Sequence, residues 1–335
     1  MQIPLVSILT PFKNTKAFLT DCIDSVLNQT FTNWEMILVD DFSTDESYKL
    51  VKEFSKKDLR IKLFKNTNKG IIGALQLAFE HSQGSFITRM DSDDIMDVQK
   101  LEILAHNLKE HGNNHVAVGL VKYFSEDDIG DGYSKYENWL NELTKTGSNF
   151  FEIYKECVIP SPCWMIHKED LMTSDAFNPY RYPEDYDLTF RFYEQGFSCI
   201  PCQEILHYWR DYPTRSSRTH EHYALNYFLD LKMHYFLKLD YDTSRPLVVW
   251  GAGFKGKMVA KTLVEKQIPF YWICNNPKKI GKKIYKQKML DFTYIEQLEN
   301  SQSIITVANE DAQAYIKTYM QKLNKRHMKD YFFFC

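Results

Sequence analysis

The sequence lacks a long apolar run, an excess of either charge and a regular cysteine framework. No stretch approaches the roughly 20 apolar residues that a membrane-spanning helix needs. The first seven residues have no basic segment followed by an apolar core, so we expect no secretion signal. The seven cysteines are an odd number without framework spacing, which favours free thiols in a reducing compartment. We therefore expect a cytoplasmic protein, and peripheral association with the inner face of the plasma membrane is compatible with these absences.

The composition is that of a soluble globular protein with one large domain or two ordinary ones. The 335 residues are 44% hydrophobic and 25% charged. The formal net charge of −3 arises from acidic and basic residues mixed along the whole chain. A nucleic-acid-binding protein usually has a basic patch or stripe, so we expect no nucleic-acid partner.

Apolar strand-like runs alternate with amphipathic helix-like segments in the first 110 residues. The predicted strands are 5–10, 36–39, 61–64 and 86–88, and the predicted helices are 16–27, one starting at 43–46, 70–81 and 98–110. Further strands are predicted at 116–121 and 163–167 and further helices at 184–196 and 225–239. This alternation predicts an α/β fold, with a mostly parallel sheet between layers of helices.

The acidic turn that follows the predicted strand 86–88 is the most informative feature. Asp91, Asp93 and Asp94 place three carboxylates within four residues. Like charges this close repel one another and resist burial, so they favour a bound cation. Oxygen ligands suit Mg²⁺ or Mn²⁺, which bind one or two carboxylates together with substrate phosphates. The alternative is a solvated acidic turn that caps the next helix.

Two other predicted strands also end in polar residues, Thr10 before Pro11 in one and Asp40 with Asp41 in the other. Ligands of parallel α/β sheets bind at the carboxyl ends of the strands. We therefore expect these residues and the acidic turn to line one crevice.

Glu184 and Asp185 open the predicted helix at 184–196, directly after Pro183. Carboxylates at a helix N-terminus are favourable by about 0.3–1 kcal/mol each, which accounts for these acids structurally. The alternative is that one of them is a general base. The sequence alone does not separate these two interpretations.

An arginine-rich segment follows, which we predict to be a loop over residues 207–218. Arg210, Arg215 and Arg218 alternate with hydroxyl residues, a composition that suits an anionic ligand such as phosphate. The alternative is a set of surface arginines paired with Asp211 and nearby acids.

The strand–helix pattern restarts at residue 247. A predicted strand at 247–250 leads into a Gly-x-Gly-x-x-Gly sequence at 251–256, a helix to 266 and a strand at 270–273. This is the context of a dinucleotide-binding fingerprint, but Cys274-Asn275-Asn276 stands where the ribose-binding acid is expected. Nicotinamide dinucleotide binding is therefore disfavoured, and we favour a structural or regulatory role. We predict a catalytic domain at 1–222, a helical linker at 223–244 and a Rossmann-like domain at 245–335.

The ordered set of N-terminal motifs resembles family 2 glycosyltransferases of the GT-A fold over roughly residues 3–220. The matching segments are 6–14, 25–31, 35–45, 68–71, 91–94 and 184–185. Segment 209–218 resembles one found in a bacterial branch of the family. The C-terminal domain resembles the nucleotide-sugar-binding half of bacterial sugar acetyltransferases, with 276–281 as the matching stretch. Two departures are Phe12, where the family commonly has Tyr, and Phe42, where it usually has Gly.

The resemblance implies transfer of a sugar, with inversion, from a nucleoside-diphosphate-sugar, with a UDP-sugar favoured. It implies that Asp40 or Asp41 holds the base, Asp91 the ribose, and Asp93 with Asp94 a Mn²⁺ or Mg²⁺ ion. Asp185 would be the catalytic base, with Glu184 as the second candidate. The other residues expected to bind the donor are Thr10, Pro11, Phe12, Asn14, Lys69, Gly70, Arg89, Ser92, Arg215 and Arg218.

The expected acceptor is a glycan or a lipid-linked sugar of bacterial cell-surface polysaccharide synthesis. Two alternatives remain at this point. The first is a sugar nucleotidyltransferase, which shares the acidic metal site. Such enzymes carry a Gly-rich loop with Arg and Lys directly after the first strand, whereas residues 11–14 of this chain are Pro-Phe-Lys-Asn. A regulatory protein that binds a sugar nucleotide without transferring the sugar is the other.

Overall fold

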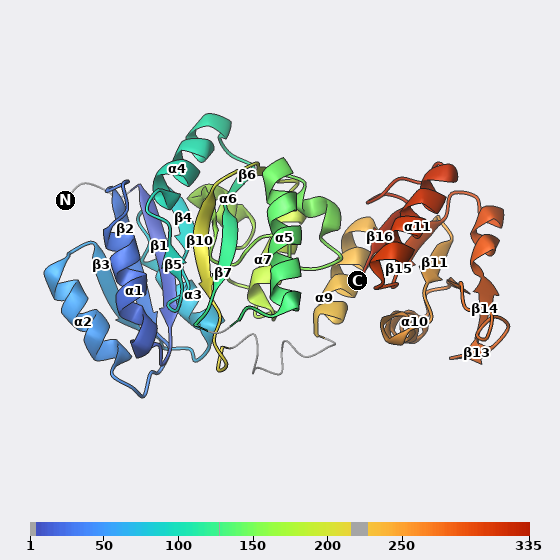
Figure 1. Ribbon diagram of the computed structural model, residues 1–335, viewed down its shortest axis with the longest axis horizontal. Coiled ribbons are helices and arrows are strands. Elements are labelled where there is room, and N and C mark those ends of the chain that lie inside the picture. The colour runs from blue at the N-terminus through green and yellow to red at the C-terminus, as the bar shows by residue number, and fades with distance from the viewer. Residues whose placement is uncertain (1–4, 127, 216–226) are drawn as a thin grey trace. The chain divides into compact units, whose positions relative to one another are not determined.

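The computed structural model describes residues 5–126, 128–215 and 227–335 (Figure 1). Contacts divide the chain into two compact units. The N-terminal unit contains Met1–Phe150 and Val158–His222, and the C-terminal unit contains Phe151–Cys157 and Tyr223–Cys335. The short segment Phe151–Cys157 thus interrupts the first unit in sequence but packs in the second.

The N-terminal unit is built on a seven-stranded sheet in the order β3-β2-β1-β4-β8-β6-β9. Its parallel half consists of β1 (Val6–Phe12), β2 (Trp34–Asp40), β3 (Ile61–Lys65) and β4 (Phe86–Arg89). β8 (Trp164–His167) is antiparallel to β4 and to β6 (His115–Val118), and β9 (Ser198–Ile200) is parallel to β6. All residues of β1 and β2 are buried, as in strands covered on both faces. The predicted mostly parallel α/β sheet is confirmed.

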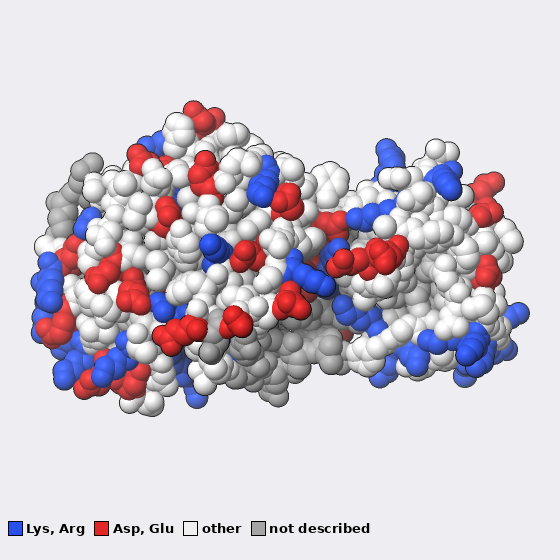
Figure 2. All heavy atoms as spheres, in the orientation of Figure 1, with Lys and Arg blue, Asp and Glu red and all other residues white. Residues whose placement is uncertain are grey.

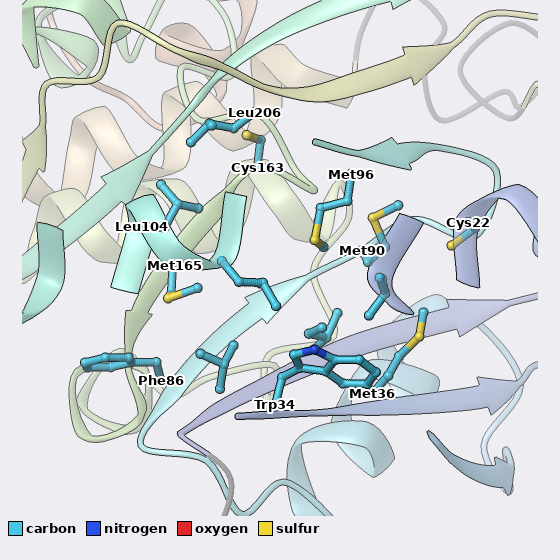
Figure 3. Close-up of a cluster of buried hydrophobic side chains, with 14 of the residues drawn as sticks. Cys22, Trp34, Met36, Phe86, Met90, Met96, Leu104, Cys163, Met165 and Leu206 are labelled. Atoms are coloured by element: carbon cyan, nitrogen blue, oxygen red, sulfur yellow. The ribbon is translucent and has the colours of Figure 1, made fainter. Parts of the chain in front are cut away.

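Helices flank this sheet (Figure 1). They are α1 (Lys16–Leu27), α2 (Ser47–Lys57), α3 (Ile71–Glu80), α4 (Lys100–His111), α5 (Asp131–Thr146), α6 (Lys168–Thr173) and α7 (Glu184–Glu194), with a 3₁₀ turn at Asn149–Glu152. On α1 the buried side chains recur every three to four residues, which is the apolar face that the sequence predicts. Cys22 of α1 lies in a core with Trp34 and Met36 of β2 and Phe86 of β4 (Figure 3).

The single strand predicted at 116–121 is wrong, because the chain changes sheets at Gly119. β6 ends at Val118, and β7 (Leu120–Phe124) joins β5 (Ile95–Met96) and β10 (Ile205–Arg210) in a separate sheet of order β5-β10-β7. A Cβ atom at Gly119 would lie 2.7 Å from Cβ of Leu206 and 2.9 Å from Sγ of Cys163. Only glycine allows this close approach.

Two further boundaries differ from the predictions. The segment predicted as a loop over 207–218 begins as strand β10, parallel to β7 and antiparallel to β5. Helix α2 begins at Ser47 and not at 43–46, because residues 43–45 form a loop that is hydrogen-bonded to Asn14.

The C-terminal unit contains a second sheet of order β13-β14-β12-β11-β15-β16. Its strands are β11 (Leu247–Trp250), β12 (Tyr271–Cys274), β13 (Lys283–Ile284), β14 (Gln287–Asp291), β15 (Gln302–Ile305) and β16 (Tyr331–Phe333). Its helices are α9 (Tyr227–Tyr235), α10 (Phe254–Glu265) and α11 (Glu310–Lys322). A π-helical turn lies at Phe236–Asp240 and a 3₁₀ turn at Phe292–Gln297. All pairs are parallel except β13 with β14. The resemblance of this unit to sugar acetyltransferases stays a prediction.

Tyr154 anchors the segment Phe151–Cys157 in this unit. Its ring stacks on Phe334 with centroids 5.2 Å apart, and its hydroxyl donates a 2.5 Å hydrogen bond to Oδ2 of Asp240. Glu152 adds an ion pair of 3.2 Å with Nζ of Lys317. In the described part of the chain, no helix has both the length and the apolar character needed to cross a membrane.

Candidate active site

The strand order brings the two acidic turns to one edge of the sheet. β1 lies between β2 and β4 and is parallel to both, with Phe12 opposite Asp40 and Leu9 opposite Arg89. The turns that leave β2 and β4 therefore flank the loop that leaves β1. Thr15 of that loop lies 3.0 Å, hydroxyl to hydroxyl, from Ser92. The topology thus brings the polar ends of β1, β2 and β4 to one edge of the sheet, and the crevice expected there stays a prediction.

Asp41 is held rigidly after β2. Its Oδ1 accepts 2.8 Å hydrogen bonds from Nδ2 of Asn66 and from the backbone N–H of Gly70, while Nζ of Lys13 lies 3.8 Å from Oδ2. Asp40 accepts a 3.2 Å hydrogen bond at Oδ1 from the backbone of Ser43. Gly70 has a φ of +114°, which favours glycine at this position. These contacts hold both carboxylates in place at the end of β2.

Asn66 was missed by the sequence reasoning. It follows β3 as Asp41 follows β2, so the rule that polar residues at strand ends mark a site would have found it. The predicted Lys69 is exposed on the same loop.

Asn14 supports the loop after β2. Its Oδ1 accepts hydrogen bonds from the backbone N–H of Thr44 at 2.7 Å and of Asp45 at 3.4 Å, and its own N–H donates to Oγ of Ser43 at 3.0 Å. Phe42 adopts a left-handed φ of 58°, as the glycine it replaces in the family pattern could have done without strain. Asn14 therefore positions the edge of the crevice.

Asp94 is completely buried, and both of its carboxylate oxygens are engaged within the protein. Oδ1 accepts from the backbone N–H of Arg210 at 2.8 Å, and Oδ2 lies 3.0 Å from Nε2 of His207. Nδ1 of His207 lies 3.3 Å from Nζ of the buried Lys100. Burial and the neighbouring Lys100 lower the pKa of His207, so the neutral ring donates to Asp94 and accepts from Lys100. Asp94 therefore joins the turn to β10, and its role as a metal ligand stays a prediction.

Asp93, unlike Asp94, is partly exposed. Its Oδ2 accepts a 2.7 Å hydrogen bond from the hydroxyl of Tyr212, and its carbonyl accepts from Nε of Arg210 at 2.8 Å. Burial, and after it the charges of Asp94 and Asp91, raises the pKa of Asp93 to about 6. Negative charge is thus in excess here.

A divalent cation fits this donor set. Asp91 and Asp93 are both partly exposed and offer only oxygen ligands, which Mg²⁺ and Mn²⁺ prefer. A cation would also relieve the repulsion that raises the pKa of Asp93. Within residues 5–126, 128–215 and 227–335, no group of three or more His, Cys, Asp or Glu side chains is arranged to hold a metal ion.

Arg89 joins the acidic turn to the start of α7. Its Nε donates to Oδ1 of Asp91 at 2.8 Å and its Nη1 to Oε1 of Glu184 at 3.1 Å, with only 6% of the side chain exposed. Burial alone would lower the pKa of Arg89, but the carboxylates of Asp91, Glu184 and Asp185 raise it on balance. Arg89 is therefore a permanent cation that joins Asp91 to Glu184, which lies 95 residues from Arg89 in the sequence.

Asp185 lies beside this bridge at the first turn of α7. Burial, and then the charge of Glu184, raises the pKa of Asp185 to about 7, while Arg89 acts in the opposite direction. Oδ1 of Asp185 accepts a 2.8 Å hydrogen bond from the backbone of Tyr186. Asp185, Glu184, Arg89 and Ser161 line one pocket. A carboxylate with a pKa near neutrality can accept a proton from a hydroxyl, as a general base does.

Three predicted donor-binding residues lie inside β1. Thr10, Pro11 and Phe12 are buried, and Phe12 packs in the hydrophobic core. These three residues therefore have little exposed surface, and their predicted contact with the donor stays a prediction. The charge of Arg215 lowers the pKa of Asp93, which indicates that Arg215 lies near the acidic turn. Arg218 lies outside the described residues.

Residues 7–173 match the family described as glycosyl transferase family 2. The N-terminal unit carries a family 2 glycosyltransferase domain. An uncharacterized glycosyltransferase of Haemophilus influenzae is 41% identical over 120 residues, which cover 34% of this chain and 48% of that protein. The putative teichuronic acid biosynthesis glycosyltransferase TuaG of Bacillus subtilis is 40% identical over 100 residues, 30% of this chain and 40% of that protein. The chain thus spans less than half of the length of these two relatives.

The family 2 domain also has the fold of a solved glycosyltransferase. The structure of S. aureus TarS 1-349 in complex with UDP-GlcNAc aligns with a TM-score of 0.55 at 18% identity, covering 77% of this chain and 71% of that one. The structure of the same protein with UDP aligns with a TM-score of 0.52 at 19% identity, covering 77% and 70%. The GT-A-like fold predicted for this domain is confirmed.

Proposed function

We propose that this protein transfers a sugar from a UDP-sugar to an acceptor hydroxyl, with inversion at the anomeric carbon, in bacterial cell-surface polysaccharide synthesis. The observation that carries the proposal is the Arg89 bridge. It brings the acidic turn of β4, which suits a nucleotide and a cation, next to a carboxylate on α7 whose pKa is raised to about 7. Donor and acceptor chemistry therefore meet at one edge of the sheet.

The donor nucleotide is proposed to lie between the two acidic turns. Asp41, fixed by Asn66 and Gly70, faces the base, and Asp91 accepts from the ribose hydroxyls. The solved TarS structures contain UDP and UDP-GlcNAc, which supports a uridine nucleotide as the donor of this chain as well.

The proposed cofactor is Mn²⁺ or Mg²⁺, which the carboxylate of Asp93 would hold. Such an ion neutralises the charge that develops on the departing diphosphate. A unit charge about 4 Å from another is worth roughly 4 kcal/mol at an effective dielectric constant near 20, so the contribution to leaving-group stabilisation is large. The hydroxyl of Tyr212 holds the carboxylate of Asp93 in place.

The proposed reaction is a single displacement. The acceptor oxygen forms a bond to the anomeric carbon on the face opposite the diphosphate, while the bond from that carbon to the diphosphate breaks. The proton of the acceptor hydroxyl passes to the carboxylate of Asp185. Glu184 is engaged by Arg89, which leaves Asp185 as the better candidate for the base.

The proposed acceptor is a glycan or a lipid-linked sugar at the cytoplasmic face of the membrane. Support comes from the relative TuaG, a putative teichuronic acid biosynthesis glycosyltransferase. TuaG is matched over only 40% of its length, so this acceptor class is a proposal for the present chain.

Incubation of the full-length chain with Mn²⁺ and a panel of UDP-sugars tests the proposal. We expect release of UDP with one or two of the sugars, faster with acceptor than without it, and a product of inverted anomeric configuration by NMR. Binding of UDP-sugars without release of UDP from any of them would favour a regulatory sugar-nucleotide-binding protein. Formation of pyrophosphate from a nucleoside triphosphate and a sugar phosphate would favour a nucleotidyltransferase.

A further inference from the structure

We propose that the hairpin formed by β13 and β14 in the C-terminal unit docks the protein on anionic phospholipid headgroups. We call residues 278–288 the basic hairpin. The inference deepens the proposed function, on which it rests for the location of the acceptor, but its evidence is separate from the active site.

The charge of this region differs from that of the rest of the chain. Residues 266–290 contain seven lysines and no aspartate or glutamate, whereas the whole chain has a net charge of −3. The exposed lysines of the basic hairpin are Lys278, Lys282, Lys283, Lys286 and Lys288. Figure 2 shows blue atoms gathered where Figure 1 places β13 and β14. Among the described residues, none of these five lysine side chains forms an ion pair, so their charge is available to a partner.

The pairing of the two strands leaves a repulsion within the basic hairpin. Lys283 lies directly opposite Lys288 in the antiparallel register. Like charges at directly opposed positions destabilise a strand pair, so this arrangement does not help the hairpin to form. An external anionic surface would relieve the repulsion.

The tip of the basic hairpin presents an aromatic side chain and a further lysine. Tyr285 and Lys286 have left-handed φ values of 51° and 62°, a turn in which Asn and Gly are favoured because they adopt this conformation with less strain. Tyr285 is 42% exposed. The chain therefore keeps a strained, outward-facing tyrosine beside a lysine. Tyrosine is enriched at the membrane–water interface because its ring is apolar and its hydroxyl is polar.

The residue types favour a charged surface over a single phosphate ligand. Recognition of one phosphate commonly uses the bidentate fork of arginine, and residues 266–290 contain no arginine. Flexible lysines near a membrane instead respond to the negative potential of anionic lipids, and their contributions add. The aromatic tip can add an apolar contact in the layer that a membrane offers beneath its charged headgroups.

Co-sedimentation of the full-length protein with lipid vesicles tests the inference. The vesicles contain phosphatidylcholine alone or phosphatidylcholine with phosphatidylglycerol, at about 0.15 M salt, where charges are screened beyond about 8 Å. We expect binding only to the vesicles with phosphatidylglycerol. Neutralising Lys283, Lys286 and Lys288 to glutamine should weaken the binding about a hundredfold, at about fivefold per lysine. Tyr285→Ser should weaken it to a smaller extent.

A matched control replaces three exposed lysines of α2, Lys49→Gln, Lys52→Gln and Lys56→Gln, which lie among acidic residues of the N-terminal unit. The control should bind vesicles like the wild type. Equal binding by the hairpin variant and the wild type, or equal loss in the α2 control, would overturn the proposal. So would wild-type binding to heparin or single-stranded DNA with no binding to anionic vesicles. Release of UDP from the donor should be unchanged in the hairpin variant, which keeps failure of this proposal distinct from failure of the proposed reaction.

Discussion

Replacement of Arg89 by methionine would remove the one cation that pairs with both Asp91 and Glu184. Loss of one partner from a buried ion pair costs roughly 3–5 kcal/mol, because the other charge stays buried without compensation. The Glu184 side chain is 8% exposed, but that of Asp91 is 22% exposed, so water compensates the loss at that end. We therefore expect the lower end, about 3 kcal/mol. For a unit of this size each 1 kcal/mol corresponds to about 2–4 °C, so the melting temperature should fall by about 6–12 °C.

The same substitution changes the titration of the proposed base in a direction that the structure defines. The charge of Arg89 lowers the pKa of Asp185, and the charge of Glu184 raises it. Arg89→Met should therefore raise this pKa above its value of about 7, and Glu184→Gln should lower it. Because a general base acts only when deprotonated, the acidic limb of the pH–rate profile should move to higher pH in the first variant and to lower pH in the second.

The assay is the rate of UDP release with acceptor present, measured as kcat/KM across the pH range at saturating Mn²⁺. Thermal unfolding of each variant, followed by tryptophan fluorescence, supplies the stability readout. Opposite shifts of the acidic limb are the signature of charges acting on one base. Shifts in the same direction, or an acidic limb that neither substitution moves, would refute the assignment of Asp185 as that base.

Three further predictions concern single residues. Asp185→Asn should leave donor binding intact in calorimetry and lower transfer by roughly 10²- to 10⁴-fold, whereas a loss of donor affinity at normal turnover would exclude its role as base. Asp93→Asn should abolish the response of turnover to Mn²⁺. Because the pKa of Asp93 in the folded protein is raised to about 6, protonation of Asp93 stabilises the fold at low pH, and this contribution is lost as the pH rises through 6. The melting temperature of the metal-free wild type should thus fall as the pH rises toward about 6. This fall should be smaller in Asp93→Asn. Asn66→Ala should raise the KM for the donor about tenfold with little change in kcat, since it frees the carboxylate of Asp41; a change confined to kcat would contradict this.

The sequence was sufficient to predict that the polar residues at the ends of these strands lie at one edge of the sheet. Asp40 and the 91–94 turn follow apolar runs whose alternation with helices predicts parallel neighbours, and parallel neighbours share an edge. The structure places both turns beside the end of β1. Helix α1 was also predictable to its residue limits, because its apolar face repeats with the helical period.

The interior contacts of the site were not accessible from the sequence. Nothing in the sequence pairs Lys100 with His207, which lie 107 residues apart, or shows that Asp94 would be fully buried against them. A lysine on the apolar face of a predicted helix is a local anomaly, but its partner depends on how β10 enters the second sheet. The break at Gly119 has the same origin: the run 116–121 is uniformly apolar, so periodicity does not reveal that the chain changes sheets within it.

The path of segment Phe151–Cys157 limits how this protein can be cut or recombined. The chain enters the C-terminal unit at residue 151, leaves it after residue 157 and returns at residue 223. A cut between residues 222 and 223 would therefore separate Tyr154 from Phe334 and Asp240, and Glu152 from Lys317. Gene fusion at a single junction can therefore neither add the intact C-terminal unit to the transferase domain nor remove it. We expect the two units to be inherited together.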